Sequence, residues 1–187
     1  MNNNFFLKGY KYFLLILYLC LFRYLPPSSS PFFGNVFRKI RYLCCRGIFL
    51  HCGKNVNIER KAFFGTGFNL KIGDNSGLGI NCVVPSDIII GNNIMMGPEV
   101  YILSTNHNFE NLKIPMIEQG NSLKKQCIIE DDVWIGRQVI FTPGRTVKTG
   151  SIIGAGTILT KDFEPHSIIG GNPSKLIKKR GDLIRLK

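Results

Sequence analysis

The most regular feature of the sequence is an apolar residue at every sixth position, repeated in two blocks. These residues are Ile72, Leu78, Val84, Ile90, Met96 and Ile102, and then Ile129, Ile135, Phe141, Val147, Ile153 and Leu159. A small or β-branched residue often stands four places further on. A period of six fits neither the helical repeat nor simple strand alternation. It predicts a solenoid of triangular coils, in which each six-residue side turns one apolar side chain toward the axis.

The same repeat predicts how the chain is organised. The solenoid spans 51–171 with 18 residues per coil, and the 26 residues between Ile102 and Ile129 interrupt it. This excursion loop, 103–128, contains His107, and a loop of such length in a compact domain is usually functional or disordered. The flanking segments are predicted to cap the open ends of the stack. They are an apolar and basic helical segment over 1–50 and a basic helix over 172–187.

Charge is distributed unevenly along the 187 residues, which carry a formal net charge of +12. No Asp or Glu precedes Glu59, and a second basic cluster lies between Lys175 and Lys187. Such clusters favour phosphate groups, nucleic acid or anionic lipid as partners. No zinc-finger spacing, RNA-recognition signature or helix-turn-helix pattern is present, so nucleic acid is not a predicted partner. The six cysteines form no C-x-x-C pair, which indicates reduced thiols and favours a reducing, cytoplasmic compartment.

The segment from Tyr12 to Phe22 is an uncharged apolar run of eleven residues between Lys11 and Arg23. As a helix it would be about 16 Å long, roughly half of a bilayer core, which argues against a transmembrane helix. No A-x-A-like site follows, so a cleaved signal peptide is not expected. Two interpretations stay open. The helix packs on the solenoid, which we favour, or it lies peripherally in the interface of the inner membrane face.

The last block of the repeat carries the most specific sequence, "IIEDDVWIGRQVIFTPGRTVKTGSIIGAGTILTKDFEPHSIIGGNPSKLIKKR". The chain resembles the hexapeptide-repeat acetyltransferases from Gly53 to Arg180, and the resemblance is most specific in this last block. Within that family it is most similar to the galactoside, maltose and capsule or exopolysaccharide O-acetyltransferases. The resemblance implies an all-β fold, a left-handed parallel β-helix. It also implies a homotrimer that binds acetyl-CoA between neighbouring subunits and carries a catalytic histidine on an external loop.

His107 is the residue of this chain that matches that histidine. An imidazole titrates near neutral pH, so it suits a general base that takes a proton from a weakly nucleophilic hydroxyl. Such a base needs a partner that orients its other ring nitrogen. Glu99, Glu110 and Glu118 are the candidates, and the sequence does not choose between them.

The resemblance places an acceptor-binding asparagine at Asn81, and Asp87 is a weaker acceptor candidate. Asn81 also suits a turn at a coil corner, where asparagine is common. The resemblance further implies an acetyl-CoA groove, in which small residues approach the pantetheine arm and cations meet the phosphates. The residues of that groove are Trp134, Gly136, Arg137, Gly154, Ala155, Thr160, Lys161, Lys175 and Arg180.

The sequence thus predicts an acetyl-CoA-dependent O-acetyltransferase that acts on a sugar hydroxyl in the synthesis of surface polysaccharide or lipopolysaccharide. Transfer to a streptogramin-type antibiotic or to an amino sugar stays an alternative, and a non-catalytic scaffold is a third. A zinc-dependent γ-class carbonic anhydrase shares the fold, but His51, His107 and His166 lie 56 and 59 residues apart and offer no adjacent ligand pair. We therefore expect no metal, and interpret His51 and His166 as structural.

Overall fold

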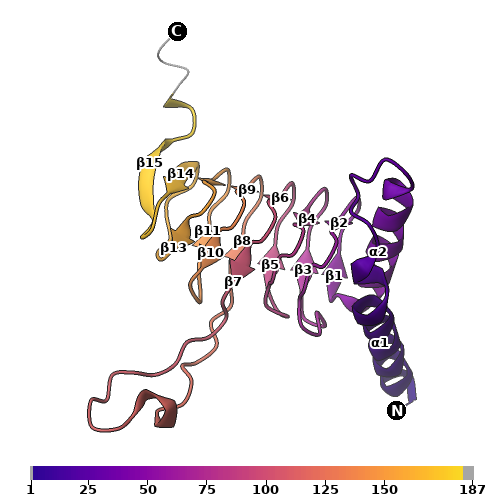
Figure 1. Ribbon diagram of the computed structural model, residues 1–187, viewed down its shortest axis with the longest axis horizontal. Helices are drawn as coiled ribbons and strands as arrows, with labels where there is room; N and C mark the ends of the chain where they lie inside the picture. Colours follow the sequence, from indigo (N-terminus) through magenta and orange to yellow (C-terminus); the bar gives the residue numbers. More distant parts are fainter. Residues whose placement is uncertain (1, 183–187) are drawn as a thin grey trace.

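A three-sided stack of short parallel strands forms the body of the protein, with two helices at its N-terminal end (Figure 1). The computed structural model describes residues 2–182, with side chains from Phe6 onward. A long arm leaves the stack between Ile102 and Ile128 and extends away from it, and the last strands lie at the end opposite the helices. The predicted solenoid class is therefore confirmed.

Each face of the stack consists of strands that are mostly two residues long and mostly pair in parallel. The first face contains β1 (His51–Cys52), β3 (Lys71–Ile72), β5 (Ile89–Ile90), β8 (Ile128–Ile129) and β11 (Thr146–Val147). The second contains β2 (Asn57–Ile58), β4 (Gly77–Leu78), β6 (Met95–Met96), β9 (Trp134–Ile135), β12 (Ile152–Ile153), β14 (Ser167–Gly170) and β15 (Lys175–Lys179). The third contains β7 (Tyr101–Ile102), β10 (Ile140–Phe141) and β13 (Ile158–Leu159).

The period of six produces the core, as predicted. Eleven of the twelve repeat residues are at most 3% exposed, and the twelfth, Met96, is partly buried. The small or β-branched residues four places further on are buried as well. Three of them are polar. The hydroxyls of Ser76 and Thr157 donate to the backbone carbonyls of Gly91 and Gly154, both at 2.7 Å, whereas the buried hydroxyl of Ser151 has no hydrogen-bond partner among the described residues. In-register stacking therefore turns each apolar position into a continuous inward column.

The three edges of the stack are the turns between its faces. At the first edge, between the first and second faces, Asn55 Nδ2 donates to Asn75 Oδ1 at 2.9 Å, and Asn75 in turn to Asn93 at 3.3 Å. These asparagines have φ near +55°, a conformation that asparagine tolerates better than most residues. The second edge, between the second and third faces, contains Gly79, where an added Cβ would lie 2.0 Å from the carbonyl oxygen of Gly97. The third edge joins the third face back to the first.

Helices α1 (Asn2–Cys20) and α2 (Gly34–Ile48), with the 3₁₀ helix η1 (Phe22–Tyr24) between them, cover the N-terminal end of the stack (Figure 1). Tyr18 of α1 is fully buried, donates its hydroxyl hydrogen to the carbonyl of Ala62 at 2.8 Å, and has its ring 4.7 Å from the ring of Phe64. The prediction that the N-terminal helix packs on the solenoid is confirmed. Nowhere in residues 2–182 does a helix combine the length and hydropathy needed to span a bilayer.

A buried ion pair ties α2 to the first coil. Arg41 has no exposed surface, its Nε donates to the carbonyl of Ile58 at 2.5 Å, and its Nη2 lies 3.6 Å from the Glu59 carboxylate. Burial raises the pKa of Glu59, but hydrogen bonds from Ser28 and Asn57 outweigh that effect and hold the pKa below its ordinary value. The carboxylate therefore stays ionised beside the guanidinium, and removal of Glu59 would leave the buried charge of Arg41 without its counter-charge.

The predicted C-terminal helix over 172–187 is wrong in its described part. Lys175–Lys179 form β15, which pairs antiparallel with β14 after a turn in which Gly171 has a φ of +94°. The parallel stack ends at β14, so the unpaired N–H and C=O groups of that strand need partners. Their pairing with β15 outweighs the helix propensity of a lysine-rich segment. Residues 183–187 lie outside the described part of the chain.

Candidate active site

The excursion around His107 is an arm that leaves the third edge of the stack after β7 and returns at β8 (Figure 1). Its two sides run antiparallel near the stack. His107 and Asn121 form an antiparallel bridge, and the N–H of Ser122 donates to the carbonyl of Asn106 at 2.8 Å. These backbone contacts hold His107 at a defined position along the arm.

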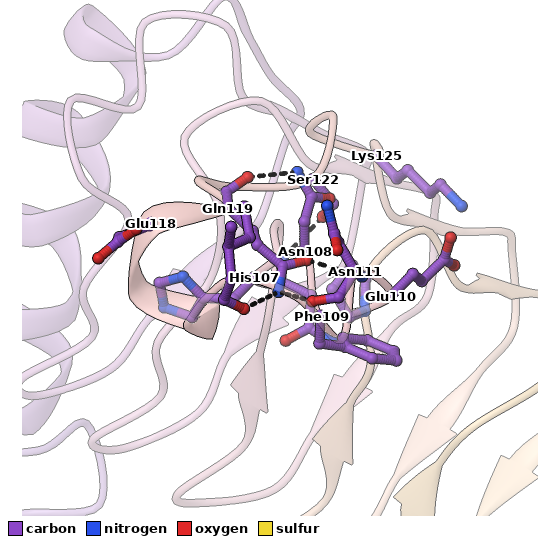
Figure 2. Close-up of a pocket in the computed structure, with 12 residues that line it drawn as sticks. His107, Asn108, Phe109, Glu110, Asn111, Glu118, Gln119, Ser122 and Lys125 are labelled. Atoms are coloured by element: carbon purple, nitrogen blue, oxygen red, sulfur yellow. Dashed lines mark hydrogen bonds between the residues drawn. The ribbon is translucent and has the colours of Figure 1, made fainter.

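Amide side chains close the tip of the arm. Gln119 Nε2 donates to the carbonyls of Asn111 at 2.8 Å and Ile114 at 3.1 Å, and its Oε1 accepts from the N–H of Asn111 at 3.1 Å. Asn108 Nδ2 donates to the carbonyl of Gln119 at 3.0 Å. These residues, the helix η2 (Met116–Glu118) and His107 surround an open cavity of about 670 Å³ (Figure 2). The arm therefore has a structure of its own, which positions the imidazole.

The three candidate partners of His107 lie in different places. Glu110 and Glu118 line the same cavity as His107, and Figure 2 shows Glu110 on the far side of the view from the imidazole ring. Glu99 instead lies on the second edge of the stack, where Arg137 binds it. Among the side chains of residues 6–182, no hydrogen bond joins the His107 ring to a carboxylate. Glu110 and Glu118 are thus the carboxylates that share the arm with His107.

The arm exposes several large apolar side chains to solvent. Leu112, Ile117 and Leu123 are 97%, 88% and 87% exposed, and Phe109 and Met116 are exposed as well. Apolar surface in water is unfavourable by roughly 25 cal/mol per Å², and a cluster of it usually marks a contact site. The arm therefore has the character of a segment that contacts another molecule.

The second edge brings together five of the predicted residues. Asn81 lies in an exposed turn with a φ of +55°; Gly136 and Arg137 lie two coils further along, and Gly154 and Ala155 one coil beyond them. Parallel strands are about 4.8 Å apart, so Asn81 is about 10 Å from Arg137 along the axis. The acceptor candidate and part of the cofactor set therefore lie in one line along the stack.

Two of the glycines on this edge differ in their steric surroundings. A Cβ on Gly136 would lie 2.5 Å from the backbone N of Ala155, whereas a Cβ on Gly154 would meet its nearest atom, the carbonyl oxygen of Ile169, at 3.3 Å. Coil stacking alone therefore requires glycine at Gly136. Trp134 on β9 lies beside this edge and is 51% exposed. An exposed indole next to small residues is a surface that an extended ligand can approach closely.

Glu99 and Arg137 form a bidentate ion pair on the second edge, with both N–O distances at 3.2 Å. Gln138 Nε2 also donates to Glu99, at 2.8 Å. The hydrogen bond from Arg137 lowers the pKa of Glu99, and the same bond raises the pKa of Arg137. Because the pair is exposed, its net effect on stability is small. Arg137 is a paired cation, so a phosphate that binds there has to displace Glu99.

Asp87 lies on the third edge and holds the returning side of the arm. Its carboxylate forms an ion pair with Lys124 at 2.8 Å, and its backbone carbonyl accepts a hydrogen bond from Gln126 Nε2 at 2.7 Å. The contacts that the structure gives to this acceptor candidate are therefore contacts that anchor the arm.

Thr160, Lys161 and Lys175 lie at the C-terminal end of the stack. Lys161 and Lys175 line a cavity of about 390 Å³ together with Lys179, a residue that the sequence analysis missed. Lys179 reaches this cavity only because β15 turns back on β14, and no periodic signal in the sequence marks that turn. Asp162 and Glu164 line the same cavity, so the three ammonium groups leave a net positive charge there, which favours phosphate groups.

Arg180 does not join this lysine cluster. Its Nη1 donates to Asp132 Oδ2 at 2.7 Å and to the carbonyl of Gly150 at 3.1 Å, which places the guanidinium at the first edge. His166 lies at the same edge with a φ of +60°, and His51 lies in β1 on the first face. Within residues 2–182, no group of three or more His, Cys, Asp or Glu residues is arranged to hold a metal ion. The candidate residues of one chain are therefore spread over all three edges.

Comparison with known proteins gives close matches over most of the chain, although no family model matches it. The galactoside O-acetyltransferase of Escherichia coli is 31% identical over 137 residues, which are 72% of this chain and 66% of that protein. The structure of a maltose O-acetyltransferase from Clostridium difficile superposes with a TM-score of 0.73 and 29% identity, over 95% of this chain and 89% of that one. The structure of a galactoside acetyltransferase in complex with coenzyme A superposes with a TM-score of 0.75 and 26% identity, over 96% of this chain and 84% of that one.

A six-residue repeat folded as a three-sided parallel stack is the architecture on which these structures superpose. The chain belongs to the hexapeptide-repeat acetyltransferases, and its fold is their left-handed parallel β-helix. Within that family, galactoside and maltose O-acetyltransferases are among the members to which it is similar. The aligned segment spans between 56% and 66% of the lengths of three curated relatives.

Proposed function

We propose that the protein transfers an acetyl group from acetyl-CoA to a hydroxyl group of a saccharide, with His107 as general base. The reaction takes place between two subunits of a homotrimer. The observation that carries this proposal is the position of His107 on an arm that extends away from its own stack and exposes apolar side chains. The second edge, with Asn81, Gly154 and Ala155, is a different edge of the same triangular stack, so the arm of a neighbouring subunit is needed to complete the site.

The residues present fit acetyl-CoA. On the second edge, the half-exposed Trp134 and the small residues Gly154 and Ala155 leave room for a pantetheine arm beside the backbone. At the C-terminal end, Lys161, Lys175 and Lys179 outnumber the two carboxylates that line the same cavity, and this net positive charge favours phosphate groups. The similarity to a galactoside acetyltransferase solved with coenzyme A supports the same ligand here.

The role of His107 is to move one proton twice. It accepts the proton of the acceptor hydroxyl as the hydroxyl oxygen attacks the thioester carbonyl. When the carbon–sulfur bond breaks, His107 returns that proton to the sulfur. A general base of this kind accelerates a reaction by about 10² to 10⁴-fold. The rest comes from the alignment of the two substrates and from donors to the developing oxyanion.

For the acceptor, we propose a sugar hydroxyl of a surface polysaccharide or lipopolysaccharide precursor. Asn81 supports this assignment, because its exposed amide lies on the same edge as the residues proposed for acetyl-CoA and can bond a hydroxyl group. An amino sugar or a streptogramin-type antibiotic is the alternative acceptor. Six free thiols, of which Cys45 is fully buried, favour a reducing and therefore cytoplasmic location.

The release of CoA thiol from acetyl-CoA in the presence of galactosides, maltose, nucleotide sugars, amino sugars and streptogramins identifies the acceptor. His107→Ala is expected to lower kcat by about 10² to 10⁴-fold while calorimetry shows unchanged CoA binding. Lys113→Gln on the same exposed arm is the matched control and should retain full turnover. Unchanged turnover in His107→Ala would overturn the assignment of the base.

The partner of His107 is identified by a pair of variants on the arm, Glu110→Gln and Glu118→Gln. A carboxylate that bonds an imidazole raises its pKa, so loss of the true partner should shift the acid limb of the pH–rate profile to lower pH. The other variant then serves as the control. If neither profile moves, both carboxylates are excluded and the orienting group comes from outside the arm.

A further inference from the structure

The outer side of α1 is apolar rather than polar. Leu15 and Tyr18 are buried against the rest of the molecule, whereas Tyr10, Phe13 and Ile16 are exposed. A spacing of three residues places these three side chains in one stripe, on the side of the helix opposite to Tyr18. A helix whose only task is to cap a solenoid normally has a polar outer face. The exposed stripe therefore needs a partner.

The outer side of α2 combines apolar and basic residues. Val36, Lys39, Leu43 and Arg46 follow one another at intervals of three and four residues, and all four are exposed. The opposite side of the helix is buried and contains Arg41. This alternation places cations beside aliphatic side chains along one stripe.

The two stripes meet at Gly47. A Cβ on Gly47 would lie 2.3 Å from Leu14 and 3.6 Å from the ring of Tyr10, so α1 crosses α2 there. Leu43 precedes Gly47 by four residues and lies on the same side of α2. Together the two stripes form one region, the cap surface, which consists of Tyr10, Phe13, Ile16, Val36, Lys39, Leu43 and Arg46.

The charge of this end of the molecule is of one sign. No Asp or Glu occurs before Glu59, and Glu59 is itself paired with Arg41. Anionic headgroups attract basic side chains by about 1 kcal/mol each, and aromatic and aliphatic groups enter the boundary below them. The cap also forms one end of the stack, and the N-terminus of α1 extends beyond it (Figure 1). A flat surface can therefore reach the cap without contact with the coils.

We propose that the cap surface docks on the interface of an anionic lipid bilayer and holds the solenoid there. Phe13, Ile16 and Leu43 enter the headgroup region, and Lys39 and Arg46 meet the lipid phosphates. This binding uses neither the arm nor the second edge, so it does not depend on the proposed acetyl transfer.

Co-sedimentation of the purified full-length protein with vesicles tests this proposal. Binding is expected to equimolar phosphatidylcholine and phosphatidylglycerol vesicles and not to pure phosphatidylcholine, and it should weaken as salt is added. Phe13→Ser should lower the partition coefficient about tenfold and Lys39→Gln about fivefold. Ile177→Ser, at the far end of the stack and 63% exposed, and Lys71→Gln on the exposed side of β3 are the matched controls and should bind like the unaltered protein.

Absence of binding to the anionic vesicles overturns the proposal, and so does equal binding by Phe13→Ser and the unaltered protein. A lower oligomeric mass of Leu43→Ser in light scattering also overturns it, because the cap surface is then a contact between copies of this chain. Phe13 and Leu43 point outward, so both variants are expected to keep the thermal midpoint of the unaltered protein. None of these measurements uses acetyl-CoA.

Discussion

Two inactive variants should restore activity when they are combined in one trimer. His107→Ala removes the base from the arm. Ala155→Trp places a large ring on the second edge, and because Ala155 is exposed the ring extends over the proposed groove rather than into the core. His107→Ala alone should retain no more than about 1% of the activity, given a general-base contribution of ~10² or more. Ala155→Trp alone should be inactive because the ring occupies the proposed acetyl-CoA groove.

The expected recovery follows from the geometry of a closed ring. Each site of a cyclic trimer takes the arm of one subunit and the second edge of its neighbour. In any trimer that contains both variants, in either ratio, a single site combines an intact His107 with an intact Ala155. A pure mixed trimer should therefore show about one third of the unaltered kcat, with KM unchanged. If the arm and the edge of one chain formed the site together, recovery would be zero.

The assay needs mixed trimers of known composition. The two variants carry different affinity tags, are co-expressed and are purified on both tags in turn, and light scattering verifies the mass. His107→Ala combined with itself under both tags is the control and should show no recovery. A verified mixed trimer without activity would refute a site between subunits, and a monomeric mass would refute the trimer itself.

Three further variants test the cap, the stack and the arm. Glu59→Gln should lower the free energy of unfolding by about 2 kcal/mol in urea titrations, because buried Arg41 loses its counter-charge. The folded-state pKa of Glu59 lies below its ordinary 4.5, so the stability that the carboxylate contributes is complete above pH 4.5 and is lost as the pH falls through the folded-state pKa. The variant should lack this pH-dependent part of the stability. Gly79→Ala should cost about 2–4 kcal/mol in thermal unfolding, since its Cβ would meet the Gly97 carbonyl. Gln119→Leu should lower kcat about tenfold and leave the thermal midpoint unchanged, because it loosens only the arm.

The inward positions of the solenoid could be predicted because stacking imposes them. Each coil must repeat the one before, so a residue such as Ile90 recurs above Ile72 and below Ile129. The arm could be located for the same reason, as the interval in which the repeat stops. The C-terminal strand could not, because Lys175–Lys179 has no periodic pattern and its conformation depends on the open edge of β14.

The site was predictable only in part. The resemblance identified His107, and the structure places it on the arm between two coils. The six-residue period shows which residues point inward. It does not show which outward-pointing residues before the arm lie on the same edge as those after it, because the arm interrupts the count. Glu99 and Arg137, which form an ion pair, are 38 residues apart in sequence with the whole arm between them, and no sequence pattern indicates that they meet. Lys179 was missed because it reaches its cavity through the turn between β14 and β15.

The arm carries the proposed base, whereas the paired strands of the stack hold the fold together. The stack continues across the insertion without a change of register, since Ile90 pairs with Ile129 on the first face and Ile102 with Phe141 on the third. The strands that flank the arm therefore keep their partners whatever the arm does. The tip of the arm lies away from the stack, so substitutions there should add to the stability effects of substitutions in the coils, whereas Asp87, which pairs with Lys124, couples the base of the arm to the stack. A base carried on such a segment can be repositioned toward a different acceptor while the edge proposed to bind acetyl-CoA keeps its geometry.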